Sequence, residues 1–338
     1  MIPLTELSIK ERNEIFNEAE GRIGVRARII EKDFWVCWIL DQIFSDSALA
    51  PHITFKGGTS LSKGYDLIKR FSEDVDLTIS KAHLGVTEEN DPIHAPSRKN
   101  RDKRLKELVM SAERFVSNEI QSILAEKAGA LGDAARITSS DDKQTLLFYY
   151  PTTGVGSQDL DGYIQEVVRL EFGVRGDSWP TEKRKVTPML DEVFGESLAF
   201  KQVNVNTMIP ERTFWEKILI LHAEAHRPLT KSSPERFSRH YYDVVMLARN
   251  GMVERAITKK GLLSSVITNK SVYFPSAWTS YETATPGSIR LLPGQEMFKI
   301  LKKDYSLMQP MFLEKPPSFD IMMSELSEVE KKLNLFLR

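Results

Sequence analysis

The feature that most constrains the fold of this chain is a strand, a glycine pair, a helix and a second strand in close succession. Residues 52–55 have the composition of a short strand, and Gly57 and Gly58 end it. Residues 59–70 have the pattern of a helix, and residues 74–79 alternate between polar and apolar side chains as a half-buried strand does. We therefore expect a fold in which helices pack on a β-sheet.

Two aspartates make the second strand chemically informative. Asp74 and Asp76 lie two residues apart, so both carboxylates project from the same face of the strand. Neighbouring carboxylates repel each other, and a divalent cation that prefers oxygen ligands, such as Mg²⁺, compensates for this repulsion. The pair predicts a metal site, although an Asp-x-Asp pair that stands alone is more often structural or solvated.

The glycine pair predicts the other half of the same chemistry. Gly57, Gly58 and Thr59 end a strand and open a helix, where a phosphate can approach the backbone and meet free N–H groups. A glycine turn alone is usually only a turn. A phosphate cradle followed about sixteen residues later by a carboxylate pair is more specific, because phosphoryl transfer requires positioning together with charge neutralisation.

The rest of the chain predicts further helices and strands around this unit. Helices are expected at residues 5–45, 97–130, 211–226, 237–249 and 320–337, and strands at 145–150 and 165–174. Loops or irregular segments are expected at 81–97, 132–143, 152–162, 176–204 and 228–234.

Composition excludes several classes of protein. The 338 residues carry a formal net charge of −1, so any site for a polyanion must be a local patch. The single cysteine, Cys37, lies in an apolar run and excludes a disulfide framework; we expect it to be a buried thiol. Without a long apolar run or a signal-peptide pattern, we expect a cytoplasmic protein that does not contact a membrane.

Five segments stand out together, residues 31–36, 55–63, 70–77, 211–217 and 239–243, with a Pro- and aromatic-bearing pattern at 274–287. They resemble the nucleotidyltransferase toxins of the AbiEii family, which belong to the DNA polymerase β-like superfamily and include the MenT toxins. The resemblance implies an α+β fold, with a nucleotidyltransferase-type mixed β-sheet core, packed helices and a helical C-terminal region. We expect residues 1–200 to form the nucleotidyltransferase domain and residues 201–338 a mainly helical domain that completes the active-site cleft.

The same resemblance implies the site residues. Ser72, Asp74 and Asp76 would form the metal and nucleotide motif, and Lys217 and Asp243 would complete the catalytic set. The nucleotide-binding candidates are Gly57, Gly58, Thr59, Lys63, Ser72 and Lys217.

Simple chemistry supports the two later residues. Lys217 flanks the apolar face of its predicted helix, from which its ammonium group could reach a triphosphate; an ordinary surface lysine is the alternative. Asp243 lies in a helix that is apolar almost all round, so its carboxylate needs a partner. Arg239 and Lys217 are the two candidates for that partner.

A third carboxylate is expected from the strand at 165–174, because polymerase β-like enzymes often use one from a neighbouring strand. Arg169 and Glu171 share its polar face, while Glu166 falls on the opposite face. Glu171 is therefore the candidate metal ligand, and an exposed strand glutamate is the alternative. His222 and His226 have the spacing of a zinc-binding helix but no third ligand, and we expect a structural pair.

Positive charge is concentrated at residues 98–106, which carry six cations and one acidic residue. Arg101, Lys103 and Arg104 are the candidates for contacts with an RNA backbone, with a solvated helix face as the alternative. By resemblance the acceptor is a tRNA 3′ end.

We therefore predict an Mg²⁺-dependent enzyme that moves NMP from an NTP to an acceptor 3′-hydroxyl. Its role would be the toxin of a type IV-like toxin–antitoxin or phage-defence system, with a cognate AbiEi-like antitoxin as partner. Three alternatives stay open. The same machinery could modify a small molecule or a protein hydroxyl, the enzyme could transfer the γ-phosphate, or the fold could be a non-catalytic nucleotide- or RNA-binding module.

Overall fold

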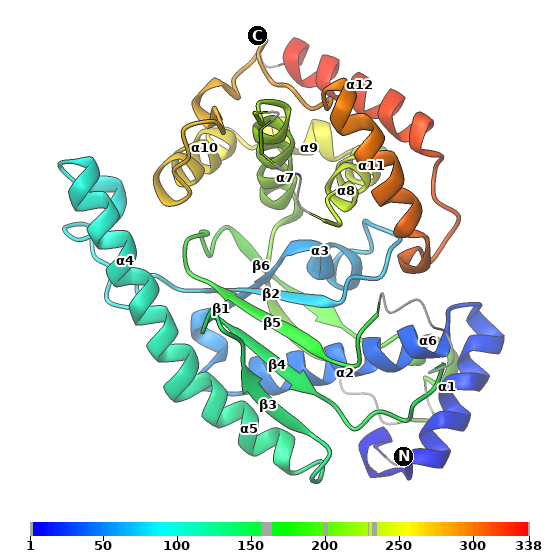
Figure 1. The fold of residues 1–338 in the computed structure, drawn as a ribbon. Helices are drawn as coiled ribbons and strands as arrows, with labels where there is room; N and C mark the ends of the chain where they lie inside the picture. Colours follow the sequence, from blue (N-terminus) through cyan, green and yellow to red (C-terminus); the bar gives the residue numbers. More distant parts are fainter. Residues whose placement is uncertain are drawn as a thin grey trace.

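In the part of the chain that is described, a mixed seven-stranded β-sheet lies at the centre of the molecule (Figure 1). The computed structural model describes residues 3–156, 164–195, 197–198, 202–228, 230–231 and 235–336. The strands are β1 (Ile53–Lys56), β2 (Asp74–Ile79), β3 (Arg136–Ser139), β4 (Thr145–Tyr149), β5 (Val168–Gly173), β6 (Thr181–Val186) and β7 (Val203–Met208). Their order is β3-β4-β5-β2-β1-β7-β6, so β2 lies in the middle, antiparallel to β1 and parallel to β5.

Helices surround the sheet on both sides. Those before β7 are α1 (Ile9–Ile23), α2 (Ala27–Phe44), α3 (Gly57–Thr59), α4 (Arg98–Phe115), α5 (Gln121–Gly129) and α6 (Leu190–Phe194). Those after it are α7 (Pro210–Ala225), α8 (Ser238–Arg249), α9 (Met252–Thr258), α10 (Leu262–Tyr273), α11 (Gln295–Leu307) and α12 (Phe319–Phe336). No helix in the described ranges combines the length and apolar character that a bilayer crossing requires.

Two hydrophobic cores fix which face of β2 is polar. The first joins α1, α2, α4 and α5 to the sheet and buries Val75, Leu77 and Ile79 of β2. The second is built mainly from helices α7 to α12. Figure 1 shows α2 and the C-terminal helices on opposite sides of the sheet. Because side chains alternate along a strand, the aspartates of β2 face the C-terminal helices.

The structure confirms the predicted α+β class and the strand at 74–79. The helical region predicted at 5–45 is two helices, because Gly24 ends α1 in a left-handed conformation with φ of 69°. Ser8 and Glu11 form the capping box at its start. Cys37 is buried, and burial raises the pKa of its thiol to about 12.

The helix predicted at 59–70 is wrong beyond Gly64. Residues Ser60–Gly64 form a π-helical turn, and the chain then leaves helical geometry. Arg70 instead forms an isolated antiparallel bridge with Phe312, a contact far away in the sequence. Pairing with the C-terminal region therefore overrides the local helical pattern.

Two strands lie in segments that were expected to be irregular, and β7 begins at the end of one of these segments. β3 and β6 are the edge strands of the sheet, and the sequence of β6, Thr-Glu-Lys-Arg-Lys-Val, shows mainly charge. Charged side chains are usual on edge strands, where they prevent pairing with other chains. The last strand, β7, ends at Met208, so the chain leaves the sheet eight residues after the boundary expected at residue 200. The division into two domains itself stays a prediction.

Candidate active site

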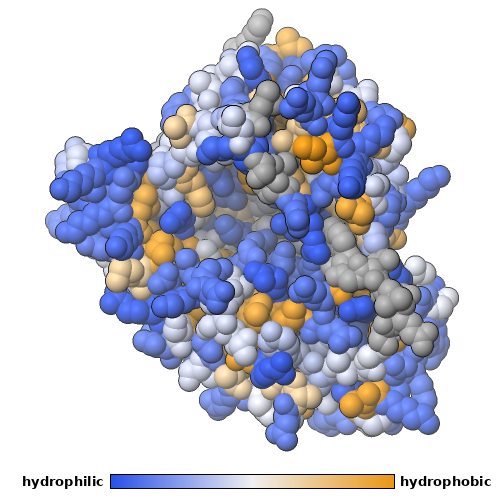
Figure 2. Space-filling view, viewed as in Figure 1, coloured by the Kyte–Doolittle hydropathy of each residue, from blue (hydrophilic) through white to orange (hydrophobic). Residues whose placement is uncertain are grey.

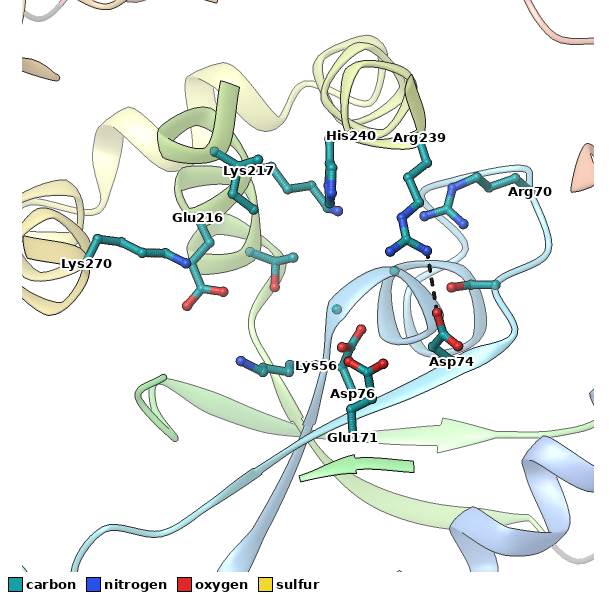
Figure 3. A pocket seen from close by; sticks show the side chains of 15 residues that line it. Lys56, Arg70, Asp74, Asp76, Glu171, Glu216, Lys217, Arg239, His240 and Lys270 are labelled. Carbon is teal, nitrogen blue, oxygen red and sulfur yellow. Dashed lines mark hydrogen bonds and ion pairs between the residues drawn. The ribbon is translucent and has the colours of Figure 1, made fainter. Parts of the chain in front are cut away.

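Three carboxylates line one pocket on the face of the sheet that points to the C-terminal helices (Figure 3). In the parallel β2–β5 pair, Asp76 lies opposite Glu171 and Asp74 lies opposite Arg169. The alternation of side chains therefore places Asp74, Asp76 and Glu171 on the same face. These three residues, which we call the carboxylate cluster, are the metal ligands predicted from the sequence.

Cations from five separate parts of the chain complete the pocket, which has a volume of about 190 Å³. They are Lys56 of β1, Arg70 of the β1–β2 connection, Lys217 of α7, Arg239 of α8 and Lys270 of α10. Figure 3 shows Arg70 and Arg239 on one side of the carboxylate cluster and Lys270 with Glu216 on the other. The pocket thus combines clustered negative charge with positive walls.

Gly57 and Gly58 form the floor beside Asp76 and Ser72. Gly57 has φ of +75°, and a Cβ atom there would lie 1.9 Å from Oδ2 of Asp76. A Cβ at Gly58 would lie 2.7 Å from Nη2 of Arg70 and 3.0 Å from Oγ of Ser72. Both positions therefore exclude a side chain, and a phosphate bound at this turn would lie directly beside the carboxylate cluster.

Asp243 holds two of the pocket cations from behind. Its carboxylate accepts two hydrogen bonds from Arg70, Nε to Oδ1 at 2.7 Å and Nη2 to Oδ2 at 2.8 Å. Nζ of Lys217 lies 2.8 Å from the same Oδ2. All three side chains, which we call the cation–aspartate cluster, are buried, and Asp243 itself does not line the pocket. Asp243 is therefore placed to position Arg70 and Lys217.

The backbone around Arg70 is fixed by the C-terminal region. The amide of Phe71 donates to the carbonyl of Met311 at 2.7 Å, and the amide of Leu313 donates to the carbonyl of Lys69 at 3.1 Å. These bonds explain why a residue of the β1–β2 connection stays beside α8. They also make the position of Arg70 dependent on the whole fold.

Arg239 contacts the carboxylate cluster instead of Asp243. Its Nη1 lies 3.5 Å from Oδ2 of Asp74, as the dashed line in Figure 3 marks. On the other side of Asp74, Nε of Arg169 lies 3.8 Å from Oδ1. The sequence offered Lys217 and Arg239 as partners for Asp243. In the structure Asp243 pairs with Lys217 and with Arg70, and Arg239 does not contact it.

The pKa values of the carboxyl groups are shifted in opposite directions in the two clusters. Burial raises the pKa of Asp76, and the charge of Asp74 adds to the rise although Lys56 opposes it. Burial also raises the pKa of Glu171 to about 6, with Asp76 and Asp74 contributing. Burial alone would raise the pKa of Asp243, but Arg70 and Lys217 hold that pKa well below its ordinary value. Negative charge is thus balanced around Asp243 and unbalanced in the carboxylate cluster.

Comparison with known proteins decides the family. The model of the nucleotidyl transferase AbiEii toxin family, described as a type IV toxin–antitoxin system, matches residues 38–331. The chain belongs to the AbiEii family. As an AbiEii protein it is a nucleotidyltransferase toxin, which implies an NTP as substrate and an antitoxin as partner.

Two solved structures are similar to this AbiEii protein. MenT4, a nucleotidyltransferase toxin from Mycobacterium tuberculosis H37Rv, is 15% identical, with 97% of this chain and 99% of that chain covered and a TM-score of 0.40. JHP933 from Helicobacter pylori is 12% identical, with 90% and 97% covered and a TM-score of 0.30. A search of curated proteins gives no match.

The AbiEii carboxylate cluster fits a divalent metal ion by the chemistry of its donors. The carboxylate oxygens of Asp74, Asp76 and Glu171 are hard ligands. Burial is the main cause of the raised pKa of Asp76 and of Glu171, and neighbouring carboxylates add to both, a repulsion that a cation would offset. Among the described residues, no three acidic, histidine or cysteine side chains converge closely enough to hold a metal ion as they stand. Mg²⁺ therefore stays a prediction.

A buried ion pair supports the start of β2. Nζ of Lys32, on α2, lies 2.8 Å from Oε2 of Glu73 and also donates to the carbonyl of Gln165 at 2.9 Å. Arg236 forms an ion pair with the other oxygen of Glu73. Glu73 is 7% exposed and precedes Asp74, so this network holds the carboxylate cluster against α2 and the segment before α8.

Two predicted nucleotide-binding residues lie away from the pocket wall. The hydroxyl of Thr59 donates to the carbonyl oxygens of Ser72 and Asp74 and so holds the chain that enters β2. Lys63 pairs with Asp33 at 2.8 Å and is mostly buried. Neither side chain lines the pocket, whereas Gly57, Gly58, Ser72 and Lys217 all do.

The three RNA-binding candidates occupy different environments on α4. Lys103 is largely exposed and lies 3.8 Å from Glu107. Arg104 donates to the carbonyl of Asp91 at 2.7 Å. Arg101 pairs with Asp102 at 2.8 Å and lines a separate hollow beside the segment that follows α10. None of the three lines the active-site pocket.

Sequence reasoning missed several residues that line the pocket. They are Lys56, Arg70, Thr213, Glu216, Ile220, His240 and Lys270. Most of them lie within the segments that resemble AbiEii proteins, so that signal could have identified them. Lys270 lies on α10 outside any motif used above, and only the packing of α10 against α7 brings it to the pocket. Burial lowers the pKa of His240, and the positive charges of Lys217 and Arg239 lower it further.

Proposed function

We propose that this protein transfers a nucleoside monophosphate from an NTP to the 3′-hydroxyl of an RNA, in a reaction that depends on Mg²⁺. The observation that carries the proposal is a single pocket in which the carboxylate cluster lies beside a glycine turn and a positive wall. A phosphate cradle, clustered carboxylates and fixed cations are the parts that nucleotidyl transfer needs, since it depends on positioning and charge neutralisation.

The triphosphate would bind at the glycine turn. The backbone of Gly57 and Gly58 and the hydroxyl of Ser72 face the pocket beside Arg70 and Lys217. Because Asp243 fixes both of these cations from behind, they do not need to reorganise when charge develops on the leaving pyrophosphate. Arg239 lines the same pocket and lies 3.5 Å from Asp74.

Asp74, Asp76 and Glu171 would hold the metal. When bound, Mg²⁺ supplies neutralisation of the phosphates and lowers the pKa of the attacking hydroxyl. Asp76 is the central ligand, because it lies opposite Glu171 on β5 and directly against Gly57.

The transfer itself exchanges one phosphorus–oxygen bond for another. The 3′ oxygen of the acceptor forms a bond to the α-phosphorus, and the bond from that phosphorus to the bridging oxygen of the β-phosphate breaks. Pyrophosphate leaves toward the cationic wall, and the hydroxyl proton passes to a carboxylate oxygen of the carboxylate cluster. The acceptor therefore enters from the side opposite Arg70.

We propose a tRNA 3′ end as the acceptor and an AbiEi-like protein as the antitoxin. A tRNA offers an unpaired 3′ end, which can enter a pocket that a duplex cannot. The positive residues of α4 supply a local site for its backbone. Since NTPs and tRNA are the substrates, the reaction would take place in the cytoplasm.

The test incubates the protein with total tRNA, MgCl₂ and each α-³²P-labelled NTP in turn. We expect label on tRNA with one or two of the NTPs, loss of that label with Asp74→Asn or with EDTA, and wild-type labelling with Glu166→Gln. Glu166 is the matched control because it precedes β5 and does not line the pocket.

Other products would overturn particular parts of the proposal. Label on a small molecule or a protein, but not on tRNA, would identify a different acceptor. Transfer from γ-labelled ATP without release of pyrophosphate would identify a phosphotransferase. NTP binding without any turnover would leave only a binding module.

A further inference from the structure

Two hollows lie beyond the active-site pocket, between α4 and the segment that follows α10. The first, about 510 Å³, is lined by Leu105, Lys106 and Val109 of α4 together with Arg175 and Phe274. The second, about 260 Å³, includes Arg98 and Arg101 of α4 in its lining. In Figure 2 the molecule is hollowed at its centre, and hydrophobic surface lies between that hollow and the hydrophilic outer end of α4.

The first hollow lies next to the catalytic pocket. Lys270 lines the pocket, and its ammonium group lies 4.5 Å from the centre of the Phe274 ring, which lines the first hollow. On the other side, Gly176 follows Arg175, and a Cβ at Gly176 would lie 2.8 Å from Nζ of Lys56. Pro275 lines both hollows, so the two are neighbours. We call the two hollows together the acceptor groove.

One face of α4 forms a wall of this groove. Arg98, Arg101, Leu105 and Val109 recur every three or four residues, so they share one side of the helix. Lys103, Glu107 and Arg114 are four and seven residues apart, so they share another side of the helix, and none of them lines the groove. The helix therefore divides its positive charge between a groove side and a solvent side.

The groove offers positive charge with an aromatic surface. Arg98, Lys106 and Arg175 are exposed and form no ion pair with another described residue, whereas Arg101 is paired with Asp102. The lining of the groove also contains two acidic residues, Asp102 and Glu282. Phe274 is half-buried. Cations that follow a backbone, combined with a ring on which a base can stack, are characteristic of grooves for single-stranded nucleic acid.

The two hollows also contain polar groups that can meet a base or a sugar. Oγ of Ser271 is buried and has no hydrogen-bond partner among the described residues, and Ser271 lines the second hollow. The volume of the first hollow falls within the range of about 300–1,000 Å³ that accommodates small molecules, so it has room for a nucleotide and not for a duplex.

We infer that the acceptor groove holds the single-stranded 3′ end of the RNA acceptor as it leaves the carboxylate cluster. Arg98, Lys106 and Arg175 contact its phosphates, and Phe274 stacks on a base. This inference rests on the proposed function, since it assigns the path of the acceptor to that site. It also separates the positive residues of α4, which form one cluster in the sequence, into those that line the groove and those that face solvent.

The test measures binding of a 5′-fluorescein oligoribonucleotide with a free 3′-hydroxyl by anisotropy at several salt concentrations. We expect Lys106→Ala and Arg175→Ala each to reduce the slope of log K against log [salt] by about 0.7, the contribution of one single-strand phosphate contact. Phe274→Leu should weaken binding about 10-fold, as expected for loss of one stacked base. Arg114→Ala, on the solvent side of α4, should leave both values unchanged.

A kinetic readout separates the acceptor from the nucleotide. The groove variants should raise KM for the RNA and leave KM for the NTP and the Mg²⁺–NTP shift in Tm at wild-type values, which also shows that they are folded. An equal effect of Arg114→Ala and Lys106→Ala would overturn the groove in favour of general attraction to a charged helix. Wild-type RNA affinity in all three groove variants would overturn it as well.

The same experiment distinguishes failure of the groove from failure of the proposed function. If the wild-type protein labels RNA but the groove variants behave like wild type, only the groove is wrong. If the wild-type protein neither binds nor labels RNA, the RNA acceptor itself is wrong and the groove with it. Equal binding of a blunt-ended RNA duplex would contradict a single-stranded path.

Discussion

The carboxylate cluster and the cation–aspartate cluster are adjacent, yet they solve the problem of partly buried charge in opposite ways. Asp243 lies at 2.7–2.8 Å from both Arg70 and Lys217, so its charge is paired twice. In the carboxylate cluster the ion pairs with arginines of the described chain have nitrogen–oxygen distances of 3.5–3.8 Å, and three acidic groups share one face of the sheet. One cluster is complete within the chain, and the other needs a ligand.

This difference assigns a different role to each cluster: the cation–aspartate cluster positions side chains, and the carboxylate cluster carries out the chemistry. A paired charge stabilises the fold when its partner is present, whereas unbalanced carboxylates cost stability and are retained where a metal or substrate offsets them. We therefore expect substitutions in the carboxylate cluster to change activity far more than stability. In the cation–aspartate cluster we expect both to change.

The largest expected effect is the loss of activity in Asp76→Asn. Removing a metal ligand takes away several kcal/mol of transition-state stabilisation, which corresponds to a decrease in kcat of about 10³-fold or more. Because the substitution also removes a repelling charge, Tm should be unchanged or raised. Label transfer and thermal unfolding measure the two quantities, and a folded Asp76→Asn protein with more than a tenth of wild-type activity would contradict the assignment.

The second expected effect is the loss of stability in Asp243→Asn. The substitution leaves Arg70 and Lys217 buried without their counter-charge, which should cost about 3–5 kcal/mol in the free energy of unfolding. Denaturant titration measures it. The matched control is Glu325→Gln, because Glu325 forms the same two-bond pair with Arg249 at the surface and should cost no more than about 1 kcal/mol. Equal losses of unfolding free energy in the two variants would show that the buried ion pairs of Asp243 contribute no more than a surface pair.

A smaller effect is expected from Mg²⁺ on the protein alone. A cation that binds the carboxylate cluster at about 100 times its Kd should stabilise the fold by about 2.7 kcal/mol, and therefore raise Tm by a few degrees. Asp76→Asn should abolish most of this shift, whereas Asp243→Asn should retain it. A shift of the same size in Asp76→Asn would place the metal elsewhere.

The smallest effect is a pH dependence that has opposite sign in the two clusters. The pKa of Glu171 is raised from 4.5 to about 6 in the folded protein, so the folded state holds its proton more tightly. Its ionisation therefore costs stability as pH rises between about 4.5 and 6 in metal-free protein. The difference in Tm between Glu171→Gln and wild type, with the variant higher, should therefore increase as pH rises through this range and stay constant above it.

For Asp243 the sign is reversed. Its lowered pKa means that stability from this residue is present at neutral pH and is lost only in strong acid. The Tm difference between wild type and Asp243→Asn should therefore be constant between pH 5 and 7. A difference that closes on lowering the pH within this window would contradict the double pairing of Asp243.

Much of the fold could be predicted because its signals are local. The alternation of β2, the glycine turn and the apolar faces of α2, α7 and α8 each depend on residues close together in the chain. The edge strands β3 and β6 were missed because an edge strand buries few side chains, so it lacks the apolar alternation on which the prediction rests. The helix prediction was wrong for residues 65–70 because pairing with the C-terminal segment, not propensity, decides their path.

By itself the sequence determined that Asp74, Asp76 and Glu171 would share the polar faces of their strands, since alternation along a strand follows from backbone geometry. Only the tertiary structure decided that Arg70 joins Lys217 at Asp243, that Arg239 turns to Asp74, and that Lys270 reaches the pocket. These residues come from elements far apart in the chain. Which of several cations meets a given carboxylate depends on how those elements pack, because an ion pair forms wherever the fold brings opposite charges within a few ångströms.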